Sequence, residues 1–120
     1  MKVGLWIAAT AGAALCVAAA AAAPVALTVS PTTVRAGHVV QIKGNAGDCP
    51  MGDGVTILSR AFKHTHEFAG VPAVYALVRS GGRFGVRTTI PRARHVGRYV
   101  LTARCGGGNL GVSAHLRVIH

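Results

Sequence analysis

Alternation of apolar and polar residues is the feature that most constrains this 120-residue chain. From residue 25 onward, apolar residues recur at every second position over short runs, and no longer segment repeats them at helical spacing. A period of two places successive side chains on opposite faces of a strand, so each run predicts a strand with one buried face. Seven such runs, separated by Gly and Pro, lie at residues 25–30, 37–44, 55–59, 74–79, 83–90, 98–105 and 112–118.

Seven short strands with turn residues between them are typical of a β-sandwich with Greek-key connections, so the predicted fold class is all-β. In the sixth run, Leu101, Ala103 and Cys105 share the inward phase. The stretch "HVGRYV" resembles a tyrosine corner, in which the Tyr99 hydroxyl bonds to nearby backbone. Trp6 precedes the strand region, so the buried tryptophan of antibody domains is not expected here.

Residues 1–23 differ in kind from the rest of the chain. Lys2 is followed by an apolar stretch at residues 3–17, and then by an alanine run that ends at Pro24. This order of charge, apolar segment and small residues predicts a secretory signal peptide, which leaves residues 24–120 as one domain. Retention as an N-terminal anchor is the alternative, because the apolar run reaches the length that spans a bilayer.

Two cysteines remain after the predicted leader, Cys49 and Cys105. Export places them in an oxidising compartment, and two cysteines allow one intramolecular bond. The inward phase of Cys105 suits a disulfide in the core between the sheets. Closing the loop between Cys49 and Cys105 stabilises the folded chain by about 4 kcal/mol in the chain-entropy model. This is large beside a total free energy of unfolding of roughly 5–15 kcal/mol.

The glycines at 106–108 predict a turn, because an anion-binding phosphate loop would also need Lys and Ser or Thr.

Three stretches resemble the small exported immunoglobulin-like proteins of actinobacteria: "LTVSPTTVRAGHVVQIKG", "CPMGDGVTILSRAF" and "GRYVLTARCGGGNLGVSAHLRV". The resemblance covers most of residues 27–118. It implies an immunoglobulin-like β-sandwich that is secreted or associated with the cell wall, with no established chemistry. Enediyne-carrying apoproteins of the neocarzinostatin type are more distantly similar. They carry two disulfides and a ligand cleft, whereas this chain has cysteines for one bond.

The chain is strongly basic, with 13 Lys and Arg against 3 Asp and Glu and a formal net charge of +10. Only Lys2 of these bases lies in the predicted leader. An excess of this size favours loose attraction to a polyanion such as an anionic cell-envelope polymer. We predict anion-binding residues at Arg92, Arg94, Arg98 and Arg104. Sequence-specific binding of nucleic acid is not expected, because no aromatic platform accompanies the bases. A basic surface with no fixed partner is the alternative, and the sequence does not identify a partner protein.

The stretch "KHTHEF" is the strongest candidate for a metal site. His64 and His66 are two residues apart and share a face if extended, and Glu67 is adjacent. Two imidazoles and a carboxylate are ligands that zinc or copper accepts, and His38 or His95 could complete the set. The alternative is a solvated loop between the third and fourth strands.

Enzymatic chemistry is not expected, and no resident cofactor is predicted. Three acidic side chains leave little for paired acid–base work, no serine lies in a G-x-S-x-G setting, and the predicted disulfide consumes both thiols. The sequence thus predicts a secreted or cell-wall-associated binding or structural module with weak affinity for anionic polymers, and with no membrane anchor after cleavage. The alternative is a carrier of a small ligand or metal that uses the His-rich loop or a cleft between the sheets.

Overall fold

The computed structural model describes residues 23–120, and the regular secondary structure of these residues is almost entirely β-strand. Their one short helical element is η1, a single 3₁₀ turn at Ser80–Gly82. No helix in this part of the chain is long and apolar enough to cross a membrane. The predicted signal peptide and the alternative anchor fall almost wholly outside the described residues, so both remain predictions.

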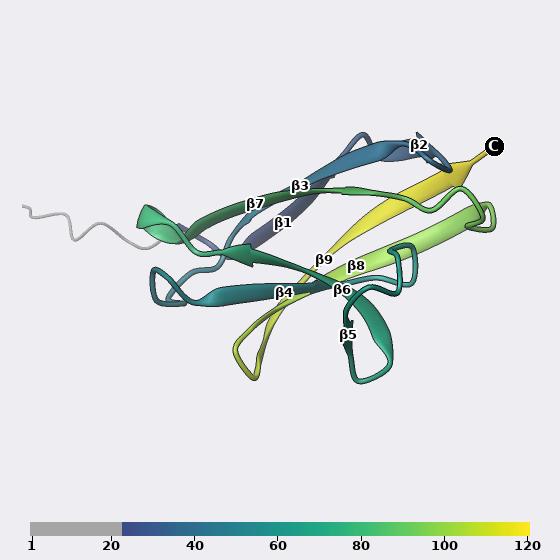
Figure 1. Ribbon diagram of the computed structural model, residues 1–120. Helices are drawn as coiled ribbons and strands as arrows, with labels where there is room; N and C mark the ends of the chain where they lie inside the picture. Colours follow the sequence, from purple (N-terminus) through teal and green to yellow (C-terminus); the bar gives the residue numbers. More distant parts are fainter. Residues whose placement is uncertain (1–22) are drawn as a thin grey trace, which may run out of the picture.

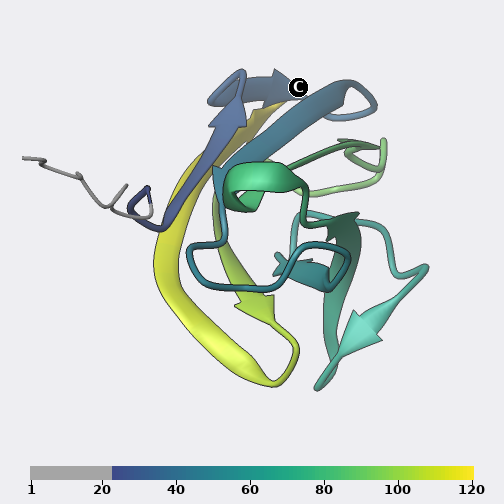
Figure 2. The ribbon, with the colours of Figure 1, turned by 90° about the vertical axis from the view of Figure 1, so that its left-hand side faces the viewer.

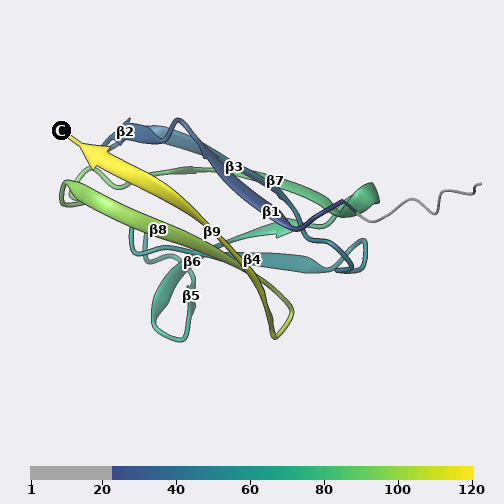
Figure 3. The ribbon, with the colours of Figure 1, turned by 180° about the vertical axis from the view of Figure 1, so that it is seen from behind.

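The strands form two sheets that lie one above the other (Figures 1 and 3). The smaller sheet is antiparallel in the order β1-β3-β7, with bounds Ala26–Ser30, Val39–Asn45 and Arg83–Thr89. The larger sheet has the order β2-β9-β8-β4-β6-β5. In that order its strands are Thr33–Arg35, Gly108–Ile119, Gly97–Cys105, Gly54–Leu58, Val71–Leu77 and Glu67–Phe68. β1 lies beside β9, so the two sheets meet along that edge (Figure 2).

All seven predicted strands are present, and the structure adds two short ones. β2 has three residues and pairs in parallel with the end of β9, joining Thr33–Arg35 to Arg117–Ile119. β5 has two residues and pairs Glu67 and Phe68 with Pro72 and Val71. Both are too short to show alternation. β2 depends on a partner far along the chain. β5 forms the end of the "KHTHEF" stretch, for which a solvated loop was the alternative to a metal site.

The space between the sheets holds the hydrophobic core, and the predicted alternation matches it. Val40, Ile42 and Leu101 are 0% exposed. Fully burying an aliphatic side chain of this size contributes about 1.5–3 kcal/mol. Other buried members come from every major strand of both sheets: Leu27, Val29, Val34, Val55, Ile57, Ala76, Phe84, Ala103, Ala114, Leu116 and Val118. Burial of these inward residues therefore holds the two layers together.

The predicted disulfide between Cys49 and Cys105 is confirmed, and it lies at the edge of the core: Cys49 is a buried member of the core and Cys105 packs against it. Cys49 lies in the loop between β3 and β4, and Cys105 is the last residue of β8. Their Cα atoms are 6.1 Å apart and the bond closes a separation of 56 residues. Cys105 pairs in register with inward Val55, so its predicted phase is correct. The bond ties the loop that leads from the smaller sheet to the larger one to the end of β8.

Tyr99 makes the predicted corner. Its hydroxyl donates a hydrogen bond to the carbonyl oxygen of His95, at 2.6 Å and four residues upstream. The ring packs against the core near the start of β8. The bond fixes how the chain enters this strand.

The glycine run after Cys105 forms the predicted turn. Cys105 pairs with Gly108, so Gly106 and Gly107 make the two-residue connection between β8 and β9. Gly106 has φ +57°, a conformation that glycine adopts at low cost.

A basic groove on the outer face of the larger sheet

The outward residues of β8 define the centre of the candidate site. They are Arg98, Val100, Thr102 and Arg104, which alternate with the core residues of the same strand. Their neighbours in register also face outward, with Arg104 beside Thr56 and Thr102 beside Leu58 on β4. On the other side, Arg98 lies opposite Arg117 and Val100 opposite His115 on β9. The face is therefore basic along β8 and β9 and apolar toward β4.

A hairpin formed by β5 and the start of β6 projects over this face (Figures 1 and 3). Its Phe68 ring lies against Arg104, with the guanidinium carbon 4.8 Å from the ring centroid. Leu58 is only 8% exposed although it lies on the outer face. The hairpin thus turns part of a sheet surface into one wall of a groove.

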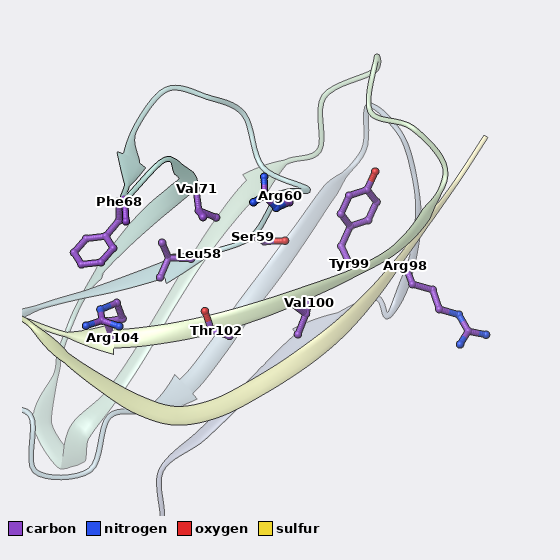
Figure 4. Close-up of a pocket in the computed structure, with 11 residues that line it drawn as sticks. Leu58, Ser59, Arg60, Phe68, Val71, Arg98, Tyr99, Val100, Thr102 and Arg104 are labelled. Atoms are coloured by element: carbon purple, nitrogen blue, oxygen red, sulfur yellow. The ribbon is translucent and has the colours of Figure 1, made fainter.

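The groove, which we call the β8 groove, has a volume of about 560 Å³. It runs from Phe68 and Arg104, past Leu58 and Val71, to Arg98 (Figure 4). The full lining is Leu58, Ser59, Arg60, Phe68, Ala69, Val71, Arg98, Tyr99, Val100, Thr102 and Arg104. It contains three arginines and no acidic residue, so its potential is positive.

Arg104 is held in a defined position at one end of the groove. One terminal nitrogen, Nη2, donates a hydrogen bond to the carbonyl oxygen of Gly107 at 2.6 Å. Its Nε is buried and has no hydrogen-bond partner among residues 23–120. A buried N–H without a partner costs about 1–3 kcal/mol, and more on a charged group.

The hairpin turn beside Arg104 is strained. Ala69 and Gly70 connect Phe68 to Val71, with φ +52° and +81°. Two positive φ angles are typical of the type I′ hairpin turn, which favours Asn-Gly or Gly-Gly. Among the described residues, Ala69 is the one non-glycine with positive φ, and it is one of the residues that line the groove.

A second, smaller hollow lies beside the β8 groove, toward β9 and β2. It has a volume of about 260 Å³ and is lined by Thr32, Arg98, His115, Leu116 and Arg117. Arg98 borders both hollows. Arg98 and Arg117 are directly opposite in register, and like charges in such a pair destabilise a sheet. We call the surface of Arg98, His115 and Arg117 the basic face.

Two of the four predicted anion-binding residues, Arg98 and Arg104, lie on this side of the molecule. Arg94 is half-buried and has another role. Its Nε and Nη2 donate to the carbonyl oxygens of Ala61 and Phe62, at 3.3 Å and 2.8 Å. Arg94 therefore holds the segment that follows β4.

Arg92 lines a separate hollow with His38 and His120. Arg83 and Arg87 face outward on β7, in the smaller sheet. The outward arginines of β7 and β8 are therefore divided between the two sheets.

The predicted metal ligands are only partly brought together. His64 Nδ1 lies 3.4 Å from Glu67 Oε1. The His66 ring instead packs against Tyr75, with 5.3 Å between ring centroids. Neither His38, beside Arg92, nor His95, beside Tyr99, appears with them in a group that could hold a metal ion. The metal site stays a prediction.

Within residues 23–120, one group of His, Cys, Asp and Glu has ligand atoms close enough for a metal. It consists of Cys49, Asp53 and Cys105, with atoms within 4.8 Å of one another. The two sulfurs are bonded to each other, so they are not free thiolate ligands.

Sequence reasoning missed Arg117 of the basic face, and it missed Leu58, Arg60 and Phe68, which line the β8 groove. The alternation did reveal that Val100 shares a face with Arg98 and Arg104. It held no signal for the contact of Phe68 with Arg104, because this contact depends on how the hairpin projects over the sheet.

No protein-family model matches this chain, and no curated protein matches it either. Solved structures share its fold. The alkylpurine DNA glycosylase AlkC of Pseudomonas fluorescens, bound to DNA containing an abasic site analog, is 20% identical with a TM-score of 0.53. The match covers 81% of this chain and 31% of AlkC. InvD of Yersinia pseudotuberculosis is 14% identical with a TM-score of 0.58, over 81% of this chain and 28% of InvD.

A tetra-tandem repeat from the extending region of a large adhesion protein is also similar. It is 16% identical with a TM-score of 0.51, over 79% of this chain and 24% of that one. This chain thus spans less than a third of each of these three chains. At these identities the likeness shows an all-β sandwich fold and nothing of activity.

Proposed function

We propose that this chain is a secreted, immunoglobulin-like module that binds an anionic polymer at the cell envelope through its basic face. The predicted signal peptide and the disulfide support export, because disulfides persist in oxidising compartments. The proposed role is binding, with no catalytic chemistry.

Three features support the immunoglobulin-like type. Among residues 23–120, the first strand, β1, lies in one sheet and the next, β2, lies in the other. Strands β3 and β7 pair in the smaller sheet, while β4, β8 and β9 lie together in the larger one. Tyr99 bonds back to His95 near the start of a late strand, as in the tyrosine corner of such domains.

The observation that carries the binding proposal is the pairing of Arg98 with Arg117. Two arginines opposite each other on a solvated sheet repel, and neither adjoining hollow is lined by an acidic residue. A polyanion that lies across β8 and β9 removes this repulsion and releases its own condensed counterions. We therefore expect weak affinity for the polymer, to which each arginine contributes separately. Binding should weaken as the salt concentration rises.

The structural neighbours fit this class of function without defining it. One is part of an adhesion protein and another is bound to DNA, a polyanion. Because the likeness concerns fold alone, the charge arrangement of this chain remains the basis of the proposal.

Immobilised polyphosphate tests the proposal as a simple anionic polymer. We expect Arg98→Gln with Arg117→Gln to weaken binding at least tenfold, and to lower the slope of log K against log salt by about one to two. Arg83→Gln with Arg87→Gln is the matched control, because it removes the same charge from the other sheet. Equal losses in both variants would show that net charge, and no particular face, drives binding.

A metal carrier is the second candidate, supported by the 3.4 Å approach of His64 to Glu67. Calorimetry with zinc and with copper tests it directly. Binding heat that disappears in a His64→Ala, His66→Ala variant would support the carrier. Absence of heat with both metals in the unaltered protein would remove it.

A further inference from the structure

The β8 groove has an apolar floor that a polymer site does not require. Leu58, Val71 and Val100 line its length, and Phe68 and Ala69 form its wall. Val100 is 48% exposed and Phe68 37% exposed, on a sheet face where polar residues are normally found. Its volume of about 560 Å³ falls within the range of roughly 300–1,000 Å³ that small-molecule sites occupy.

The charged groups of the groove suit a carboxylate. Arg60, Arg98 and Arg104 line it, with no acidic residue among the lining side chains. A guanidinium binds a carboxylate through two parallel hydrogen bonds when its plane is fixed. Arg104 meets that condition, because Phe68 lies against its guanidinium and Gly107 accepts from its Nη2.

Two features that are unfavourable for the free energy of folding occur together at the Arg104 end of the groove. Ala69 has a positive φ where Gly would be unstrained, and Arg104 has a buried Nε without a partner among the described residues. Natural chains break local rules mainly at functional sites. The covered Nε is not itself open to a ligand, so a ligand would meet the terminal nitrogens of Arg104.

We propose that the β8 groove binds a small amphiphilic carboxylate with an unbranched apolar chain. The carboxylate lies at Arg104, and the chain extends along Leu58, Val71 and Val100 toward Arg98 (Figure 4). Arg98 and Arg104 are separated by roughly 20 Å of strand at about 3.3 Å per residue, which leaves room for a chain of medium length. A polymer with evenly spaced charges would leave the apolar floor uncovered, whereas an amphiphile covers it.

This site goes beyond the proposed polymer binding and depends on different residues. Polymer binding relies on Arg98 and Arg117, while the carboxylate site relies on Phe68 and Arg104. The two ideas can therefore fail independently.

Calorimetry of the secreted protein with dodecanoate, below its micelle-forming concentration, tests the site. We expect one binding site, at least tenfold weaker in Arg104→Gln and unchanged in Arg87→Gln, a matched outward arginine on the other sheet. Acetate has the same head without the chain and should bind at least tenfold more weakly. Dodecyltrimethylammonium has the same chain with the opposite charge and should not bind.

A second variant tests the site in case Arg104→Gln does not fold. Val100→Asn alters an exposed floor residue, so we expect a native NMR spectrum and at least tenfold weaker dodecanoate binding. In the unaltered protein, dodecanoate should shift the resonances of Phe68, Val71 and Val100. Equal binding by Arg104→Gln, or shifts confined to other strands, would overturn the site. If polyphosphate still binds in that case, the amphiphile site is refuted and the proposed function stands.

Discussion

Gly44 lies in β3, the central strand of the smaller sheet. It pairs with Leu27 of β1 on one side and with Phe84 of β7 on the other. A Cβ placed there would overlap the Ala26 carbonyl oxygen and the Phe84 ring. A backbone neighbour cannot move aside without disturbing the β1–β3 ladder, so this position requires glycine.

We expect Gly44→Ala to lower the free energy of unfolding by about 2–3 kcal/mol, as overpacking does in a closely packed core. Gly85→Ala is the control, because its Cβ would lie 3.5 Å from the nearest backbone atom, an ordinary contact. Urea denaturation of both variants measures the difference. Similar stabilities for the two variants would contradict this account of Gly44.

Ala69→Gly should stabilise the protein by up to about 1 kcal/mol, because Ala at φ +52° is strained and Gly is not. The chain entropy of glycine opposes part of this gain. Ala26→Gly, at an exposed position of β1, is the control and should destabilise the protein by about 0.5–1 kcal/mol. Thermal or urea midpoints compare the two, and destabilisation by Ala69→Gly would rule out strain at this turn.

At the scale of elements, β8 joins the core, the disulfide and the groove. It pairs with β4 on one side and with β9 on the other. Its inward residues fill the core, its outward residues line the β8 groove, and its last residue is Cys105. A small displacement of β8 would therefore alter the core, the disulfide and the lining of the β8 groove together.

Tyr99→Phe removes the hydrogen bond to the His95 carbonyl at 2.6 Å. We expect a loss of about 1 kcal/mol, the usual net value of such a bond, together with faster amide exchange at the start of β8. Tyr75→Phe is the matched control, since Tyr75 is 50% exposed and keeps its ring packing against His66. Equal stability of Tyr99→Phe and the unaltered protein would show that the corner adds nothing.

At the scale of the whole molecule, a small core, a disulfide and an excess of positive charge act together. A domain of this size has little stability to spare, and its like charges repel in the folded state. The bond between Cys49 and Cys105 offsets part of both effects by restricting the unfolded chain.

We expect Cys49→Ala with Cys105→Ala to lower the free energy of unfolding by about 2–4 kcal/mol. The bond lies at the end of the larger sheet, so the far-ultraviolet circular dichroism should remain that of a β protein at low temperature. Reductant should shift the denaturation midpoint of the unaltered protein by a similar amount and leave the variant unchanged. An unchanged midpoint in the double variant would contradict a stabilising role.

The residues alone predicted the seven longer strands, the inward phase of Leu101, Ala103 and Cys105, the Tyr99 corner and the cysteine pair. These features depend on alternation and turn chemistry, which act over a few neighbouring positions, or on a count that permits one bond. Outward phase likewise placed Arg98 and Arg104 with Val100 on one face.

Folding in three dimensions settled the rest, because the contacts concerned join distant parts of the chain. β2 forms by pairing with β9, and Arg117 meets Arg98 through the register of β8 and β9. Phe68 reaches Arg104 because a two-residue hairpin projects over the sheet. A local sequence pattern carries no information about contacts between distant residues. The groove and its chemistry therefore follow only from the tertiary structure.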